Sequence, residues 1–354
     1  MKKLIVILLV CNISITFAQE YRGPYLITTS SLDIVTDASS LALGEALVAN
    51  KFFSYSFFSN PAALQNQKGV NIFYNYRSLN WSNYFGNAFY FSAGAQSSTS
   101  IGNIGISINQ LYFEKEKTSY DRVFILTYSR TLVDNIMIGI NAKLFNRNFS
   151  VPPPAQFETT PALIFDLGLI YNVGKIISEE KFSDDLNLGL SIQNFGTDYR
   201  ETVMNQEDYF VLPRYLRFGF SYKANFFCNQ ENESNLDLLV TTEYRNLLNA
   251  PKYMNDSRDN WGVGFEALFF KVFSLRYGGI ISPSTDIFSE RGKFISRYGF
   301  GFQLPFEKLG LKIPITIKFD YTPLQVQKAA LQGFQNNNTL NNFTLLFSYN
   351  KDLF

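Results

Sequence analysis

Histidine is absent from the 354-residue sequence, and cysteine occurs only twice. Histidine is the side chain that most often moves protons near neutral pH, so Ser-His-Asp chemistry, Cys-His chemistry and histidine-ligated zinc are all excluded. Cys11 lies in a segment that we expect to be removed on export, which leaves Cys228 alone and allows no internal disulfide. We expect Cys228 to be an incidental small residue. No catalytic residue, metal site or cofactor is predicted.

Charged side chains are scarce. They make up 17% of the chain, compared with about a quarter in soluble domains, and 31 basic residues balance 30 acidic ones. The basic excess that usually accompanies nucleic-acid binding is therefore missing. The mean hydropathy of −0.05 is close to zero, although aromatic residues account for 17% of the chain. Many aromatics, few charges and neutral hydropathy predict a protein with one apolar face and one polar face.

Long hydrophobic runs are also missing after the first residues. Lys2 and Lys3 precede a short apolar stretch at 4–17, so we predict a secretory signal peptide that is cut near Ala18. An uncleaved N-terminal anchor is the alternative, but the apolar stretch is shorter than the roughly 18 residues of a spanning helix. No later segment reaches that length. The exported chain is therefore either soluble outside the inner membrane or a β-barrel in the outer membrane.

Alternation of apolar and polar residues favours the barrel. Leu186, Leu188 and Leu190 alternate with Asn187 and Gly189, which is the period of two that a strand with two different faces shows. We predict fourteen such segments, long enough to cross a bilayer as tilted strands and even in number, as a closed barrel requires. Their approximate spans are 69–77, 84–93, 101–113, 121–132, 135–147, 161–174, 184–196, 213–225, 235–245, 260–269, 274–282, 294–304, 313–321 and 342–350.

The connections between these segments support the same topology. Transmembrane barrels have short turns on the periplasmic side and longer loops outside. The long connections 197–212, 246–259 and 322–341 follow odd-numbered segments, whereas the short connections 133–134 and 270–273 follow even-numbered ones. A large soluble β-sandwich would also alternate, but its polar face should be rich in Lys and Glu. The polar face here is rich in Gly, Ser and Asn, which suits a barrel interior.

A segment of a different kind precedes the first predicted strand. Residues 37–50, DASSLALGEALVAN, have the composition of a short helix rich in small residues. A less regular stretch follows and ends in SNPAAL at 59–64. The proline in this motif disfavours a helical conformation at Asn60 and indicates a turn.

These two motifs resemble the start of the FadL-like outer-membrane barrels, and more closely their PorV/PorQ branch. The matching residues are Ala42, Leu43 and Gly44, followed by Asn60, Pro61 and Ala62. Three later segments also resemble strands of that branch, and they are LNLGLSIQNFG at 186–196, LPRYLRFGFSYK at 212–223 and WGVGFEALFFKVFSLRYG at 261–278. The resemblance covers essentially the whole mature chain.

This resemblance implies an all-β fold, a fourteen-stranded antiparallel transmembrane barrel with a short helical plug inside it. The expected organisation is a signal peptide at 1–18, a plug segment at 19–68 and the barrel at 69–354. Members of the family either move hydrophobic molecules across the outer membrane or serve the type IX secretion system. The resemblance implies no catalytic residue, because the family has none.

Two groups of side chains are candidates for a functional site. Gly44, Asn60, Pro61 and Ala62 are expected to shape a plug that opens or seals the lumen, with a plain turn before the first strand as the alternative. Charged residues on the lumen face are expected to form an ion-pair network that stiffens the barrel, because an unpaired buried charge is costly. The alternative is a conduction path. These lumen charges are Arg217, Glu243, Arg245, Glu266, Arg276 and Asp320.

The outer loops and the aromatic residues are less specific. Three prolines stiffen 151–155, and 323–334 has the composition of a helical turn or two. Each of these two segments is either a docking edge for a partner or a self-contained loop. Aromatic side chains on the strands are expected to face lipid or to form interfacial girdles, and they include Tyr74, Tyr76, Phe89, Phe91, Trp261, Phe269 and Tyr349.

The leading hypothesis is a non-enzymatic PorV/PorQ-like component of type IX secretion or surface attachment, which binds secreted or secretion-machinery proteins. The alternative is a FadL-like channel for hydrophobic small molecules, and a soluble exported β protein is the third possibility. Uptake predicts a continuous apolar path past the plug and a break in one wall strand, whereas partner binding tolerates a sealed lumen. Outer-membrane lipid is an expected partner of a barrel, and nucleic acid is not expected.

Overall fold

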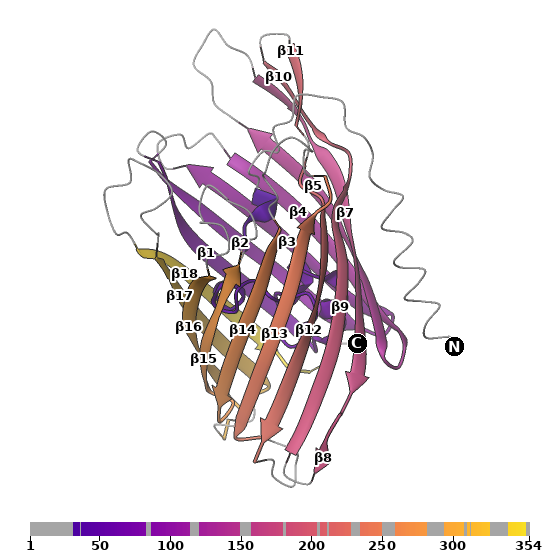
Figure 1. Cartoon of the computed structure of the whole chain (residues 1–354), viewed down its shortest axis with the longest axis vertical. Coiled ribbons are helices and arrows are strands. Elements are labelled where there is room, and N and C mark those ends of the chain that lie inside the picture. The colour runs from indigo at the N-terminus through magenta and orange to yellow at the C-terminus, as the bar shows by residue number, and fades with distance from the viewer. Residues whose placement is uncertain are drawn as a thin grey trace.

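The fold is a closed antiparallel barrel of fourteen strands (Figure 1). The computed structural model describes residues 31–35, 37–82, 86–113, 120–148, 157–179, 182–203, 206–210, 212–227, 234–249, 259–281, 294–307, 310–311, 313–325 and 339–351. In order around the wall, the strands are β1 (Val70–Ser82), β2 (Gly86–Thr99), β3 (Gly102–Phe113), β4 (Tyr120–Val133), β5 (Ile136–Asn148), β7 (Ala162–Gly174), β9 (Phe182–Gly196), β12 (Tyr215–Phe226), β13 (Leu236–Leu247), β14 (Asn260–Phe269), β15 (Phe273–Ile281), β16 (Phe294–Pro305), β17 (Ile315–Gln325) and β18 (Thr339–Tyr349). Pairing of β18 with β1 closes the barrel. The predicted fold class and the positions of all fourteen strands are confirmed.

The outward side chains form an apolar surface. Along β4, Phe124 and Leu126 point outward and are 47% and 54% exposed, while the alternating residues Ile125 and Thr127 are buried inside the barrel. A soluble monomer rarely exposes so broad an apolar surface. Closure leaves no wall strand with an unpaired edge, which is what a strand structure in lipid requires. Tyr74 and Trp261, two of the predicted lipid-facing aromatics, are 48% and 46% exposed.

The two ends of the barrel differ in their connections. The two-residue turns 100–101 and 134–135 lie at one end, and the long connections 197–214 and 282–293 lie at the other. Because long loops mark the extracellular side of such barrels, we call the latter the outer end. The end with the short turns is the inner end.

Some of the predicted loops contain strands. At the outer end, β6 (Phe157–Thr160), β10 (Tyr199–Val203) and β11 (Gln206–Phe210) form a separate three-stranded antiparallel sheet. This sheet extends past the rim at the top of Figure 1. The long connections predicted at 148–160 and 197–212 therefore contain strands that the sequence pattern did not reveal, because these strands are too short to show a clear alternation. A two-residue strand, β8 (Ser178–Glu179), extends the sheet beside β9 at the inner end.

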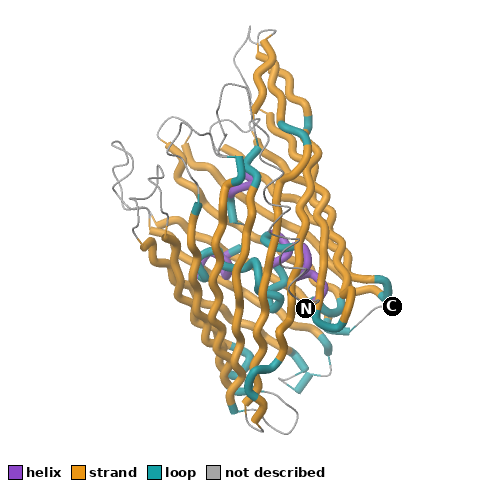
Figure 2. The backbone as a smooth tube through the Cα atoms, turned by 45° about the vertical axis from the view of Figure 1, so that its right-hand side comes forward, coloured by secondary structure: helices purple, strands orange, loops and turns teal. Residues whose placement is uncertain are grey.

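Residues 31–68, which we call the inner segment, lie within the barrel (Figure 2). Their short helices are η1 (Ser31–Asp33), α2 (Ala38–Ala42), η2 (Ser56–Phe58) and η3 (Pro61–Asn66). The Oδ1 atom of Asp37 caps α2 by accepting from the backbone N–H of Ser40 at 2.8 Å. The helix predicted over 37–50 ends much earlier, at Ala42, because Gly44 and Glu45 both adopt left-handed backbone conformations. In the described part of the chain, no helix is both long and apolar enough to cross a membrane.

Several predictions concern other parts of the chain. The signal peptide at 1–18, the prolines at 151–155 and Cys228 lie outside the described residues. The loop predicted from Pro323 starts later than expected, because Pro323 to Gln325 continue β17 and pair with β18. The rest of that loop also lies outside the described residues.

Candidate functional site in the barrel lumen

Asn60 connects the inner segment to the barrel wall. Its side-chain oxygen accepts from the backbone N–H of Ala62 at 3.1 Å and thereby caps η3, with Pro61 at the first helical position. Its Nδ2 lies 2.7 Å from the carbonyl oxygen of Val48, in the same segment. The same nitrogen lies 3.0 and 3.3 Å from the carbonyl oxygens of Leu169 and Leu190, which are paired residues of β7 and β9. One amide thus joins two parts of the inner segment to two wall strands.

Glycines on successive wall strands make room for this contact. A Cβ atom on Gly168 would lie 2.0 Å from Oδ1 of Asn60, and one on Gly139 would lie 2.4 Å from the carbonyl carbon of Pro61. On Gly189, a Cβ would lie 2.2 Å from the Val48 carbonyl oxygen. Real Cβ atoms do not approach other atoms so closely, so only glycine fits at these positions.

The row of glycines continues around the barrel. Cβ atoms on Gly262 and Gly264 would lie 2.3 and 2.5 Å from the carbonyl oxygens of Gly44 and Leu43. Gly44 itself has a φ of +64°, and a Cβ there would lie 2.2 Å from the carbonyl oxygen of Gly279. The glycine-rich polar face in the sequence therefore has a specific cause. We call Gly139, Gly168, Gly189, Gly262, Gly264 and Gly278 the glycine row.

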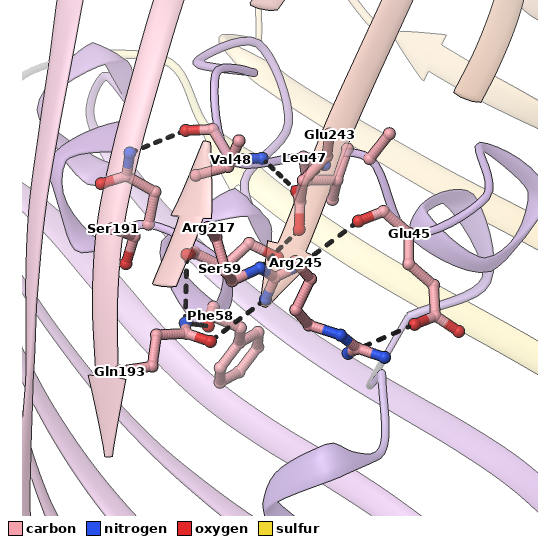
Figure 3. A network of polar contacts seen from close by, with 12 residues as sticks. Glu45, Leu47, Val48, Phe58, Ser59, Ser191, Gln193, Arg217, Glu243 and Arg245 are labelled. Carbon is pink, nitrogen blue, oxygen red and sulfur yellow. Dashed lines mark hydrogen bonds and ion pairs between the residues drawn. The ribbon is translucent and has the colours of Figure 1, made fainter. Parts of the chain in front are cut away.

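Arg217 and Glu243 link two strands to the inner segment. Nε of Arg217 lies 2.5 Å from Oε1 of Glu243, and both side chains are buried. The other carboxylate oxygen accepts from the backbone N–H groups of Leu47 and Val48 at 2.9 and 2.8 Å (Figure 3). Arg217 also donates to the side-chain oxygen of Gln193 at 3.2 Å. The pair therefore satisfies backbone donors of the inner segment as well as its own charges.

Arg276 brings together two of the other predicted carboxylates. Its Nε lies 2.5 Å from Glu266, and its other guanidinium nitrogen Nη1 lies 2.6 Å from Asp320. Lys318 lies 3.3 Å from the second oxygen of Asp320. The ring of Phe53 from the inner segment is 5.5 Å from the Arg276 guanidinium and 4.8 Å from the Lys318 nitrogen. Cation–π contacts therefore hold the inner segment on this side as well.

Arg245, the sixth predicted lumen charge, contacts the inner segment rather than another predicted residue. Its Nη1 lies 3.7 Å from Oε2 of Glu45, and Nη1 of Arg297 lies 2.6 Å from Oε1 of the same carboxylate. Burial alone would raise the pKa of Glu45, but the positive charges of Arg297 and Arg245 outweigh it and lower this pKa to about 2. Glu45 therefore stays ionised.

Sequence analysis missed other ion pairs of the lumen. Lys143 lies 2.6 Å from Asp166, and Arg147 lies 2.6 Å from Asp121, with all four side chains buried. Lys143 alternates with the apolar residues Ala142 and Leu144, and Arg147 lies on the same polar face, so a search for inward charges on neighbouring strands could have found both pairs. No such signal exists for Glu45, because it lies outside the strands.

Two separate cavities lie in the lumen, and residues of the inner segment line both of them. The outer cavity is lined by Leu32, Tyr55, Ile125, Lys143, Arg217 and Arg245, among others. The inner cavity is lined by Phe52, Phe53, Lys223, Glu266, Arg276 and Lys318, among others. The two linings have no residue in common.

Known proteins resemble this chain in fold only. No family model matches the sequence, and no curated protein matches it. Among solved structures, the Ralstonia pickettii toluene transporter TbuX is 11% identical, with 89% of this chain and 98% of that chain covered and a TM-score of 0.46. The Pseudomonas putida toluene transporter TodX is 12% identical, with coverages of 91% and 100% and a TM-score of 0.46. A Pseudomonas aeruginosa FadL homologue is 11% identical, with coverages of 90% and 99% and a TM-score of 0.43.

Both the FadL-like resemblance and its PorV/PorQ branch remain predictions from the sequence motifs. Two of the three solved structures are named as transporters. The wall itself is closed and antiparallel, its exterior is apolar, and its lumen is filled by polar groups and the inner segment. These are the features of a strand structure that lipid surrounds. The chain is a β-barrel of the bacterial outer membrane.

Proposed function

We propose that this protein is a plugged outer-membrane barrel that acts by binding other proteins at its outer end, as a component of type IX secretion or surface attachment. The observation that carries this proposal is the main-chain contact between the inner segment and the glycine row. The main chain of this plug touches the wall strands, and its backbone N–H groups at Leu47 and Val48 donate to Glu243. The side chain of Asn60 in turn donates to the wall carbonyl oxygen of Leu169, so the plug has little freedom to leave. With the lumen closed by this plug, the surfaces available for binding other molecules are the two rims of the barrel.

The outer rim offers a suitable structure. The sheet of β6, β10 and β11 extends beyond the barrel, and β6 and β11 are its two outer strands. A partner can add a strand to such an edge through main-chain hydrogen bonds. Tyr199, at the start of β10, is buried against Phe145 of the wall with ring centroids 5.4 Å apart. The base of the sheet is therefore anchored to the barrel. The choice of secretion proteins as partners rests on the resemblance of the sequence motifs to the PorV/PorQ branch.

The test is a pull-down of the tagged, full-length protein from detergent-solubilised outer membranes, with identification of the proteins that co-purify. A matched variant replaces residues 200–210 with a short Gly-Ser linker and keeps Tyr199. We expect secreted or secretion-machinery proteins with the wild type, and their loss with the variant. A wild-type barrel that purifies without any protein partner would contradict the proposal.

Uptake of hydrophobic molecules is a second candidate, and a specific observation favours it. The outer half of the lumen contains a cluster of buried apolar side chains from β4, β5, β7 and the rim, and Leu32 and Phe58 of the inner segment pack against it. This cluster and the outer cavity could receive an apolar molecule if the inner segment moved. Its members are Val123, Ile125, Phe145, Ala162, Ile164, Tyr199 and Leu212.

Uptake is measured with the purified barrel in liposomes and radiolabelled toluene as the probe. The uptake hypothesis requires faster entry than into protein-free liposomes, and slower entry when Ile125→Asp places a charge in the apolar cluster. Equal entry rates with and without the barrel would remove this candidate and leave the partner-binding proposal standing.

A further inference from the structure

Arginines from several strands converge on Glu45 in the outer half of the lumen. Arg297 of β16 and Arg245 of β13 contact its two carboxylate oxygens at 2.6 and 3.7 Å. Arg77 of β1 interacts electrostatically with the same carboxylate, and its Nε has no hydrogen-bond partner. Arg217 of β12 donates to the backbone carbonyl oxygen of Glu45 at 3.3 Å. Figure 3 shows Arg217 and Arg245 reaching the two ends of this residue.

Three arginines interact with one carboxylate of the described residues at this place. Glu243 pairs with Arg217 and uses its second oxygen for backbone N–H groups, so it does not neutralise the other arginines. Among the described residues, Glu45 is then the carboxylate that Arg77, Arg245 and Arg297 share. Guanidinium groups are suited to holding carboxylates and phosphates through paired N–H donors. Three of them around one carboxylate have the composition of an anion-binding site.

The carboxylate that the arginines hold is that of Glu45, and the backbone of this residue is strained. Glu45 has a φ of +63°, directly after Gly44 at +64°. A left-handed conformation is uncommon for a residue with a long side chain and persists only where the surroundings enforce it. Here the arginines provide that enforcement, because they hold both the carboxylate and the carbonyl oxygen of Glu45.

We propose that Arg77, Arg245 and Arg297 form a binding site for a small oxyanion, and that Glu45 occupies it as a built-in ligand. An anion that enters from the outer end competes with the Glu45 carboxylate for the arginines. The side chains of Glu45, Arg245 and Arg297 retain 11%, 13% and 12% of their surface exposed, so the site is not fully enclosed by protein atoms. Arg245 also lines the outer cavity, which gives a displaced carboxylate a place to move. Displacement frees the turn at 44–45 while the glycine row continues to hold the rest of the segment.

The test uses the purified full-length barrel in detergent and the variant Glu45→Gln, which empties the site of its charge. Thermal unfolding is followed in formate, inorganic phosphate or chloride at equal ionic strength. We expect Glu45→Gln to unfold at a lower temperature than the wild type in chloride and to recover in formate or phosphate. Calorimetric titration should give roughly tenfold tighter binding of the better anion to the variant than to the wild type, because the internal competitor is gone. Recovery in formate but not in phosphate would indicate a site for carboxylates, and recovery in phosphate but not in formate would indicate a site for phosphates.

Two controls make the test specific. Glu266→Gln also removes a lumen carboxylate, but Arg276 keeps Asp320 there, so no anion-specific recovery is expected. Arg297→Gln, added to Glu45→Gln, should abolish the recovery. Equal responses of Glu45→Gln and Glu266→Gln, or recovery that survives Arg297→Gln, would overturn the proposal. If Glu45→Gln does not fold, titration of Glu45→Asp replaces it, because the shorter side chain vacates part of the site. Absence of binding to Glu45→Asp would likewise overturn the proposal.

Discussion

Glu45 shows how one residue of the inner segment can depend on charges from distant strands. Its carboxylate is held by Arg297 and Arg245, which are separated from it by most of the sequence. The backbone conformation of Glu45 costs about 1 kcal/mol for a residue other than glycine. The ion pairs offset that cost only while the carboxylate is charged, so the stability of this region depends on pH.

The sign of this dependence follows from the pKa of Glu45. It falls from an ordinary value of 4.5 to about 2 in the folded barrel, because the two arginines outweigh the effect of burial. A lowered carboxyl pKa stabilises the fold above the unfolded-state value, and that contribution, roughly 3 kcal/mol, disappears as the pH falls through the folded-state value. We expect wild type to be more stable than Glu45→Gln at neutral pH, with the difference shrinking between pH 4.5 and 2. Urea unfolding of both proteins across that range checks it, and a pH-independent difference would contradict it.

Asn60 is the residue whose loss should matter most to the inner segment. Asn60→Ala removes the cap of η3 and leaves the carbonyl oxygens of Val48, Leu169 and Leu190 without this donor. The expected loss is about 3 kcal/mol of unfolding free energy, measured by urea unfolding in detergent. Asn66→Ala is the matched control, because it removes the hydrogen bond that Asn66 donates to the Lys51 carbonyl oxygen, and we expect this variant to lose about 1 kcal/mol. Equal losses would show that the wall contacts of Asn60 contribute nothing.

Some individual residues of the site could be predicted from the sequence. Asn60 and Pro61 stood out because an Asn-Pro step restricts the backbone, and the resemblance to a known motif added weight to them. The lumen charges were assigned to the correct face by the period of two. The partners of those charges could not be predicted, because register between strands and the path of the inner segment depend on tertiary structure. Arg245 contacts Glu45, which no pattern in the sequence connects to it.

At the scale of elements, the glycine row ties the wall strands to the inner segment. Gly168→Ala places a methyl group where Oδ1 of Asn60 now lies, whereas a Cβ on Gly105 would make an ordinary contact of 3.4 Å with Leu64. We therefore expect Gly168→Ala to lose about 1–3 kcal/mol through overpacking and Gly105→Ala to resemble the wild type. Limited proteolysis of the inner segment, together with urea unfolding, would separate them. Similar protease resistance in both variants would mean that the wall yields easily at this point.

The strands were predictable because each has one face in lipid and one in a polar lumen, which imposes strict alternation. The inner segment was harder to predict, since the composition of 37–50 favours a longer helix than exists. A helix that continued past Ala42 would lose the close approach of Gly44 to Gly279, which only a left-handed turn allows. The tertiary contact therefore outweighs the local helical preference. The short strands of the outer sheet had no alternation to reveal them.

At the scale of the whole molecule, we expect the inner segment to determine whether the lumen conducts. It contributes to the linings of both cavities, and these linings share no residue. We expect wild-type barrels in planar bilayers to show no steady ion conductance, and a variant lacking residues 31–66 to conduct. Circular dichroism and heat-modifiable gel mobility must first show that the shortened barrel folds. Steady conductance by the wild type would contradict the proposal that the inner segment acts as a plug.

The glycine row also has a consequence for how such a barrel can diverge. Many of the atoms that meet the wall glycines are main-chain atoms, including the carbonyl oxygens of Leu43, Gly44 and Val48. Every residue type carries such atoms, so these main-chain contacts do not depend on side-chain identity, although the Leu43 side chain also packs in a buried cluster with Leu239 of the wall. The wall glycines are therefore more constrained than the segment positions that meet them through main-chain atoms. A lineage could therefore alter the chemistry presented toward the barrel axis again and again while keeping the same closure.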